Sequence, residues 1–242
     1  MSDVAYKIDA VQLGKRIADT SMFLYLTDPG VPLAIAYRLW LLRSPARTIV
    51  VDTGPPIAEG RERHLTETRD LREALAVHDV DPRDIDTVLL THLHWDHAAN
   101  ADQFPNARFY AQRDEIAFLR DGRHQHPAFD RFFSTHAHLE QLVDDGRLVP
   151  LDGDIEIARG VQAIRVGGHT PGSQMFCVDI AEGRALLTGD AVPLNRNYVE
   201  RIPSGILVNV FEAIAALDKA HALSPIRLYT GHDLAPYLDL AN

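Results

Sequence analysis

Four side chains of metal-ligand type occur within six residues near the middle of the sequence. Residues 92–97 read HLHWDH and directly follow a short apolar segment that is predicted to be a buried strand. Residues i and i+2 of a strand point to the same face, so His92 and His94 should be able to bind one cation together. Asp96 and His97 lie where the chain is expected to turn, and they can face a second cation. Neutral imidazole suits zinc, iron, cobalt or nickel, and a carboxylate also suits harder ions.

Three later positions repeat one arrangement, in which a strand is followed by a small residue and then by a residue of metal-ligand type. His169 lies in the segment GGHTPG, Asp190 in TGD and His232 in GHD. Glycine permits a tight turn, which can bring such a side chain inward. A single His after a strand is more often an ordinary surface residue, and a solvated His-rich loop is the alternative for residues 92–97. The repetition favours a metal centre.

The surrounding elements predict an α/β protein. Turn signals divide residues 20–51 into three expected strands, at 23–26, 33–42 and 48–51, and a helix is expected over 62–78. Further strands are expected at 86–91 and 107–110, a helix at 113–120, short strands over 148–187, a helix over 206–223 and a last strand at 226–230. Strand-rich stretches followed by helix occur twice, which is typical of two sheets covered by helices. Because the sequence shows no repeat and no linker, residues 1–242 are expected to form a single domain.

Composition narrows the functional classes. The chain carries 24 basic and 34 acidic residues, a net charge of −10, which disfavours binding to nucleic acid or to an anionic membrane surface. Cys177 is the single cysteine, so an intrachain disulfide and a Cys-based zinc cluster are excluded. The first residues do not resemble a signal peptide, and no apolar run reaches the roughly 18 residues needed to span a bilayer. A cytoplasmic protein is therefore expected.

The order of these motifs resembles the metallo-β-lactamase superfamily over residues 20–235. The resemblance implies an αββα sandwich, with two central mixed sheets flanked by helices, and a site for two divalent metal ions, with zinc expected. Carried over by motif, the ligands of the first ion would be His92, His94 and His169, those of the second Asp96, His97 and His232, and Asp190 would bridge both. Asp52, in the segment VDTG, matches a buried Asp of the superfamily that is expected to orient a ligand or a loop.

Within the superfamily, the sequence resembles the N-acyl homoserine lactone lactonases. The likeness continues through residues 100–113 and through GDAV at residues 189–192, ahead of a Pro-Ser-Gly turn and a helix. It implies a quorum-quenching hydrolase that opens a lactone ring by attack of a metal-bridging hydroxide. A small-molecule lactone or ester would be its partner, and a homodimer is left open. Asp96 and Asp190 would take part in catalysis.

One departure from the lactonases concerns a tyrosine. Some such lactonases place a Tyr three residues after the bridging Asp, where this sequence has Pro193. Tyr198 is the nearest phenol and is the candidate for contact with the substrate carbonyl, while a surface or packing Tyr is the alternative. The His-rich segment 121–146 also leaves two interpretations open. Its aromatic residues could line an acyl-chain pocket, or a helix could pack them against the core.

Other activities on the same site stay open from the sequence. A thioesterase or small-ester hydrolase is one, although glyoxalase II-type enzymes carry a further helical domain and only ten residues follow His232 here. An iron-dependent oxidoreductase of the persulfide dioxygenase type is another, and a metal-binding module without turnover is a third. A serine nucleophile is not expected, because the sequence has no Gly-x-Ser-x-Gly segment.

Overall fold

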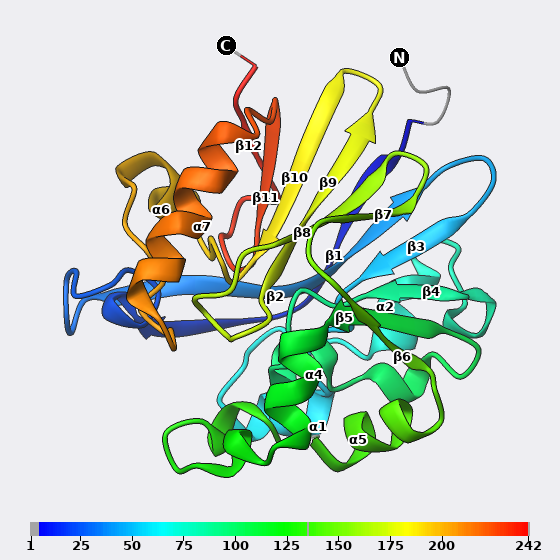
Figure 1. Ribbon diagram of the computed structural model, residues 1–242, viewed down its shortest axis with the longest axis horizontal. Coiled ribbons are helices and arrows are strands. Elements are labelled where there is room, and N and C mark those ends of the chain that lie inside the picture. Colours follow the sequence, from blue (N-terminus) through cyan, green and yellow to red (C-terminus); the bar gives the residue numbers. More distant parts are fainter. Residues whose placement is uncertain (1–4, 135, 242) are drawn as a thin grey trace. The chain divides into compact units, whose positions relative to one another are not determined.

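The structure is a computed structural model, and it describes residues 5–134 and 136–241. Its strands form two six-stranded sheets (Figure 1). The chain divides into two compact units. The first unit comprises the residues up to Lys7, Arg16–Ala36 and the residues from Gly153 onward, and the second comprises Ile8–Lys15 and Tyr37–Asp152. Each unit carries one part of the predicted ligand set.

The first sheet runs in the order β1 to β6, and its last four strands lie in the second unit. These strands are parallel: β3 (Thr48–Val51), β4 (Thr87–Leu89), β5 (Arg108–Gln112) and β6 (Leu148–Leu151). β2 (Pro32–Arg43) pairs antiparallel with β3, β1 (Lys7–Asp19) neighbours β2, and residues of β1 and β2 belong to both units. Parallel strands end at the same edge of a sheet, so the segments that follow β3 and β4 lie side by side.

Short helices and 3-10 turns connect the strands of the second unit. They are α1 (Ile57–Glu62), α2 (Leu71–Ala76), η2 (Pro82–Asp84), α3 (Trp95–Ala98), η3 (Ala101–Gln103), α4 (Arg113–Arg120), η4 (Arg123–Gln125), η5 (Asp130–Phe132) and α5 (His136–Asp144). α4 packs against β5, and α5 packs against β6 (Figure 1). One buried cluster joins Val50, Val88 and Phe109 of the strands to Leu119 and Leu142 of these helices. This core supports the parallel strands from which the predicted ligands extend.

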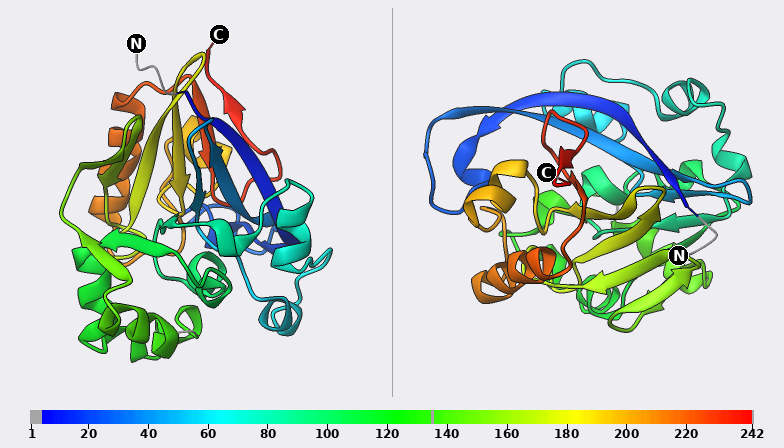
Figure 2. Two further views of the ribbon diagram at one scale, coloured as in Figure 1. Left: turned by 90° about the vertical axis from the view of Figure 1, so that its right-hand side faces the viewer. Right: turned by 90° about the horizontal axis from the view of Figure 1, so that it is seen from above.

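The sheet of the first unit has the strand order β12-β11-β10-β9-β8-β7. Its strands are β7 (Ile155–Ala158), β8 (Val161–Arg165), β9 (Gln174–Ile180), β10 (Gly183–Gly189), β11 (Arg227–Thr230) and β12 (Leu238–Asp239). Neighbours pair antiparallel, except that β10 and β11 are parallel. Helix α7 (Val210–Ala222) lies along one face of this sheet (Figure 2), where its Ala216 and Leu217 belong to a buried cluster with Met175 and Leu186. The turn η1 (Thr20–Met22) and helix α6 (Asn195–Glu200) also belong to this unit.

The expected α/β class with two mixed sheets and flanking helices is confirmed, but the helix expected over 62–78 is wrong. α1 ends at Glu62, the first residue of that range, and α2 begins only after Asp70. Between them the chain leaves the helical path, since Thr66 forms a bridge with Lys15 of β1. The Asp70 side chain then accepts two backbone amides of the first turn of α2, which starts a new helix.

Two further expectations differ from the structure near the N-terminus. Residues 23–26 form no strand, because the turn η1 precedes them and the Leu24 amide donates to the carbonyl of Thr20. Strand β1 is absent from the expected elements, since its Lys, Asp and Arg residues hide the alternation in which Val11 and Leu13 are buried. Long strands with charged residues carry a weak periodic signal.

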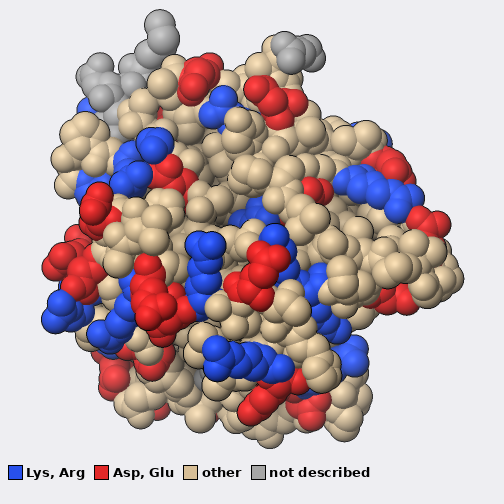
Figure 3. Space-filling model, turned by 180° about the vertical axis from the view of Figure 1, so that it is seen from behind, with Lys and Arg blue, Asp and Glu red and all other residues tan. Residues whose placement is uncertain are grey.

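The surface carries both signs of charge. On the face shown in Figure 3, Lys and Arg side chains are interspersed with Asp and Glu side chains. Exposed ion pairs include Arg47 with Asp86 at 2.9 Å and Arg120 with Asp144 at 2.6 Å, and such pairs contribute little to stability. Within the described part of the chain, no helix combines the length and the apolar character that crossing a membrane requires.

Candidate metal centre

The HLHWDH segment of the second unit begins at His92, shortly after β4 ends at Leu89. The amide of Leu90 donates to the carbonyl of Tyr110, after which the chain leaves the sheet. The rings of His92 and His94 lie 4.5 Å apart in an edge-to-face arrangement, and the ring of His97 lies 4.1 Å from that of His92. All three histidines are buried. The segment after β4 therefore gathers three imidazoles in one place, although His92 and His94 lie beyond the end of the strand. That these histidines bind a cation stays a prediction.

Helix α3 places the rest of this segment. His94 is at its N-cap, and Asp96 and His97 lie within its single turn. The Oδ2 atom of Asp96 is 3.5 Å from Nε2 of His97. The ring of His94 stacks on Phe132 at 4.9 Å and meets the edge of Phe133 at 5.0 Å, so this imidazole is held by aromatic packing.

Asp52 organises this part of the site from the end of β3. It adopts a left-handed backbone conformation, with φ at 60°, which turns its buried carboxylate toward the neighbouring segment. Its Oδ1 accepts the amide of Thr91 at 2.7 Å, and its Oδ2 accepts from Nδ1 of His97 at 2.8 Å. The Thr91 hydroxyl also donates to Asp52, and it can then accept from Nδ1 of His92 at 3.1 Å. Asp52 therefore holds the His97 ring and the backbone at Thr91 by hydrogen bonds, while the role of His97 as a metal ligand stays a prediction.

The Gly-rich turn of the first unit positions His169. Gly167 and Gly168 both have positive φ angles, and a Cβ atom on Gly168 would lie 2.5 Å from the backbone nitrogen of Ala213 in α7. Only glycine fits this close approach. The Nδ1 atom of His169 donates to the carbonyl of Ile206 at 2.6 Å, which fixes the orientation of the ring and leaves Nε2 on the opposite side.

Asp190 and His232 meet because β10 and β11 are parallel and end at the same edge. The Nε2 atom of His232 is 3.1 Å from Oδ1 of Asp190, and Nε2 of His169 is 3.6 Å from Oδ2 of the same carboxylate. The Nδ1 atom of His232 donates to the carbonyl of Ala36 at 2.9 Å. A Cβ atom on Gly231 would lie 2.5 Å from Oδ1 of Asp190, so the small residue before His232 allows this approach.

The donor and acceptor types of these groups fit a bound cation. In His97, His169 and His232, Nδ1 donates to a carboxylate or to a carbonyl, so Nε2 of the neutral ring carries a lone pair. In each case Nε2 faces a carboxylate oxygen of Asp96 or Asp190, at 3.1 to 3.6 Å. Two acceptors that face each other require a positive charge between them or a proton on the ring. Metal-binding histidines show this same pattern, with the second ring nitrogen bonded to a carbonyl or carboxylate.

The structure thus brings His92, His94, Asp96 and His97 together in the second unit, and His169, Asp190 and His232 together in the first. All seven side chains are buried and of metal-ligand type. The assignment of each ligand to a particular ion stays a prediction.

Tyr198 lies in a different environment. Its side chain is only 8% exposed and belongs to the core cluster of the first unit. Its ring stacks on His221 of α7 at 3.9 Å, with the two planes 15° apart. Burial raises the pKa of the hydroxyl. This is the packing that the alternative interpretation expected, and contact between the hydroxyl and a substrate stays a prediction.

The His-rich segment packs its aromatic residues inward. Phe133 is buried in the core cluster of the second unit, and Phe129 and Phe132 pack against that cluster. His124 is also buried, and its ring lies 4.9 Å from that of His136. Burial and the nearby His136 hold the pKa of His124 below its usual value. These contacts are the ones expected for a segment that packs its phenylalanines against the core.

Sequence reasoning missed Glu115. This glutamate is in the first turn of α4, is fully buried, and accepts the backbone amide of Leu93 at 3.0 Å. The available signal was its place in the helix, because it precedes the buried Leu119 by four residues and so shares the apolar face. A charged residue on such a face indicates a specific buried partner.

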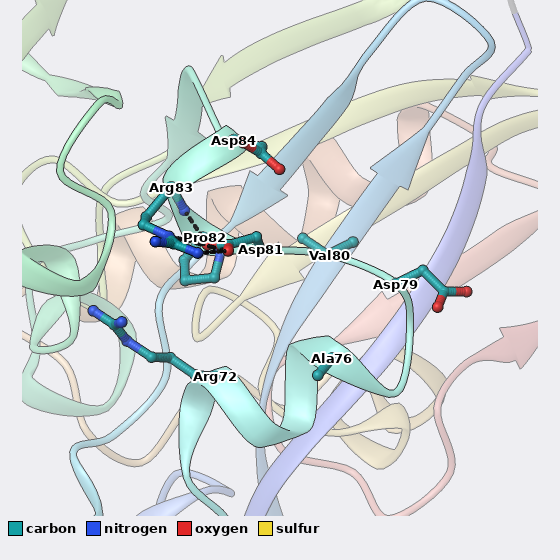
Figure 4. Close-up of a pocket in the computed structure, with 8 residues that line it drawn as sticks. All are labelled: Arg72, Ala76, Asp79, Val80, Asp81, Pro82, Arg83 and Asp84. Atoms are coloured by element: carbon teal, nitrogen blue, oxygen red, sulfur yellow. Dashed lines mark hydrogen bonds and ion pairs between the residues drawn. The ribbon is translucent and has the colours of Figure 1, made fainter.

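A pocket elsewhere in the second unit lies apart from these groups. Its volume is about 580 Å³, and it is lined by Arg72 and Ala76 of α2 and by residues 79–84 (Figure 4). The Arg83 guanidinium and backbone amide bond to Asp81 and lower the pKa of that carboxyl to about 2. None of the predicted site residues lines this pocket.

Comparison with known proteins gives one family and several relatives. The profile of the metallo-β-lactamase superfamily matches residues 38–232. An N-acyl homoserine lactonase from a Bacillus species is 26% identical, covering 94% of this chain and 93% of the relative. The crystal structure of a quorum-quenching N-acyl homoserine lactone lactonase superposes with a TM-score of 0.82, at 24% identity, covering 97% of this chain and 95% of the other. An N-acyl homoserine lactone hydrolase with N-hexanoyl-L-homoserine bound at its catalytic metal centre has a TM-score of 0.81, 23% identity and the same coverage. The structural likenesses show a shared fold.

Proposed function

Because this chain belongs to the metallo-β-lactamase superfamily, we propose that it is a metal-dependent hydrolase that opens the ring of an N-acyl homoserine lactone or a related lactone. The observation that carries the proposal is the donor set, in which three histidines turn Nε2 toward the carboxylates of Asp96 and Asp190. Similarity to N-acyl homoserine lactonases along most of the chain supports the choice of a lactone.

The proposed cofactor is a pair of divalent metal ions, with zinc as the first choice for a set of imidazole and carboxylate ligands. The proposed ligands of one ion are His92, His94 and His169, those of the other are Asp96, His97 and His232, and Asp190 is shared. When bound, such a pair lowers the pKa of a water molecule and polarises a carbonyl oxygen.

The protein's own groups prepare the ligands. Asp52 and the carbonyls of Ile206 and Ala36 hold the Nδ1 protons of His97, His169 and His232, so that each Nε2 keeps its lone pair. The proposed catalytic groups are Asp96 and Asp190, whose carboxylates can take a proton during attack and return it to the departing ring oxygen.

Tyr198 is retained as the proposed contact to the substrate carbonyl, against the competing role in packing. Tyr198→Phe separates the two, because it removes the hydroxyl and keeps the ring. A loss of turnover of about 100-fold would support a contact in the transition state. Unchanged turnover would leave only the packing role.

A substrate panel on protein of measured metal content tests the function. Acyl homoserine lactones of several chain lengths, aryl lactones and acyl thioesters are compared on metal-free protein reloaded with zinc. Faster turnover of lactones than of thioesters is expected. Full metal content with no lactone turnover would contradict the proposal, and faster thioester turnover would indicate the thioesterase activity instead. In protein analysed as purified, before the metal is removed, a single bound iron with oxygen consumption would indicate a dioxygenase.

Three further proposals concern the whole molecule. Residues 1–242 are proposed to form one domain, and the superfamily profile supports this because it covers parts of both units. A cytoplasmic location and a homodimer are also proposed from the sequence. Cell fractionation, and light scattering after size-exclusion chromatography, test these two.

A further inference from the structure

The backbone that carries His92 and His94 lies outside the sheet, so its amides need other acceptors. The last strand residue before it is Leu89, and the next helix starts only at Trp95. Residues 90–94 are all buried, and a buried amide without an acceptor is strongly unfavourable. The Leu90 amide still donates to the carbonyl of Tyr110, and side chains accept the amides of Thr91 and Leu93.

Two buried carboxylates supply these acceptors. Asp52, at the end of β3, accepts the amide of Thr91 at 2.7 Å, and Glu115, in the first turn of α4, accepts the amide of Leu93 at 3.0 Å. The two amides flank His92 in the chain. Asp52 also contacts the His97 ring, whereas Glu115 accepts from the backbone of the segment.

Glu115 is a carboxylate in a fully buried position, where it accepts the Leu93 amide. Its side chain is 0% exposed, between Ile116 and Leu119 on the buried side of α4. Burying a carboxylate is costly, and hydrogen bonds from amides offset part of that cost. An apolar residue would fill this place in a helix face at lower cost, so packing does not account for a glutamate here.

The contact fixes the segment at a point between the two proposed ligands. The Leu93 side chain is fully buried in the core cluster of the second unit, and its amide is held by Glu115. With side chain and amide both anchored, the backbone on either side has little freedom to rotate. His92 precedes Leu93 and His94 follows it, and their rings lie 4.5 Å apart with an angle of 79° between the ring planes.

We propose that Glu115 is a positioning residue, which orients His92 and His94 for metal binding by holding the amide of Leu93 between them. This inference rests on the proposed function in so far as these histidines bind metal. It assigns a role to a residue outside the ligand set. Groups that orient metal ligands without touching the metal commonly contribute about 10–100-fold to metal affinity.

The test compares three substitutions of Glu115 with a matched control. Glu115→Gln keeps the length of the side chain and an oxygen that accepts the Leu93 amide. Glu115→Leu fills the same space without an acceptor, and Glu115→Asp keeps the charge but shortens the side chain by one methylene. Glu73→Leu is the control, because Glu73 lies in the first turn of α2 and is exposed.

The readout is zinc affinity, measured by competition with a coloured chelator on purified metal-free protein. Glu115→Leu and Glu115→Asp should each lose at least about tenfold in affinity, and Glu115→Gln and the control should stay close to the wild type. A role confined to stability would lower the melting temperature of metal-free and loaded protein by the same amount, with affinity unchanged. That outcome would overturn the proposal, and Glu115→Asp decides the question if Glu115→Leu fails to fold.

A second readout needs no metal. In metal-free protein labelled with nitrogen-15 leucine, the Leu93 amide should exchange slowly with solvent in the wild type and in Glu115→Gln, and faster in Glu115→Asp. Equal exchange in all three would overturn the contact itself. If wild-type protein binds no zinc, the proposed function fails. If it binds zinc and the Glu115 variants bind it equally well, only the positioning role fails.

Discussion

The substitution Asp52→Asn tests how strongly the site depends on a carboxylate behind His97. Asp52 accepts the amide of Thr91 through Oδ1 at 2.7 Å and Nδ1 of His97 through Oδ2 at 2.8 Å. Asparagine has nearly the same shape and tolerates the left-handed backbone at φ 60°. Only one of its two terminal atoms can accept, however, so its NH2 group must face either the Thr91 amide or Nδ1–H of His97, and both of these are donors.

The expected magnitude follows from this mismatch. The variant loses one hydrogen bond to a charged group, which contributes about 1.5–3 kcal/mol. His97 can relieve the mismatch by moving its proton from Nδ1 to Nε2, but a protonated Nε2 cannot bind a metal ion. Since about 1.4 kcal/mol corresponds to a factor of ten, metal affinity should fall by about 10–100-fold.

Zinc competition with a chelator measures the affinity, and nitrogen-15 shifts of the imidazole rings report which nitrogen carries the proton. Asp84→Asn is the control, because Asp84 is exposed in η2. If Asp52→Asn bound zinc as tightly as the wild type with Nδ1 of His97 still protonated, the carboxylate would not be what orients this ring. The same inference for His169 and His232, whose Nδ1 atoms donate to backbone carbonyls, would then be weakened.

Four other outcomes are expected. Gly168→Ala should lower the free energy of unfolding by about 1–3 kcal/mol in urea denaturation, because φ is 84° and the new Cβ would meet the backbone of α7; unchanged stability would contradict this. Tyr198→Phe should keep the melting temperature and Tyr198→Ala should lose about 3–5 kcal/mol, since the ring is packed in the core. The buried Cys177 thiol, whose pKa is raised to about 11, should react slowly with a disulfide reagent in folded protein and fast after unfolding. His124 has a lowered pKa in the folded protein, so the unfolded chain takes up a proton on this imidazole first, near pH 6.5, and the free energy of unfolding should fall as the pH drops from about 7.5 to 5.5. His124→Gln should reduce this fall in urea denaturation, and an equal dependence on pH in the variant and the wild type would refute the prediction.

Part of the fold was readable from local patterns. The apolar run at 48–51 coincides with β3, and the helix expected over 206–223 contains α7, which Asn209 caps by accepting two amides of its first turn. The helix expected over 62–78 does not form as one element because Thr66 forms an antiparallel β-bridge with Lys15, which is distant in the sequence. Periodicity within a window cannot register a partner that lies outside the window.

The sequence by itself determined which residues of metal-ligand type the chain carries and that they follow strands. His92 and His94 follow a buried strand at alternate positions, and Asp190 and His232 each follow a strand after a glycine. Spacing along a strand and the freedom of glycine are local properties, so they can be read without knowing the fold.

Only the tertiary structure decided which nitrogen His97, His169 and His232 turn toward the carboxylates of Asp96 and Asp190, and what holds these side chains in place. The Nδ1 protons of these three histidines are held by Asp52, by the carbonyl of Ile206 and by the carbonyl of Ala36, and Glu115 accepts the backbone amide between His92 and His94. These partners lie 22 to 196 residues away in the sequence. Hydrogen bonds act over about 3 Å in space and carry no trace in the sequence between the residues they join.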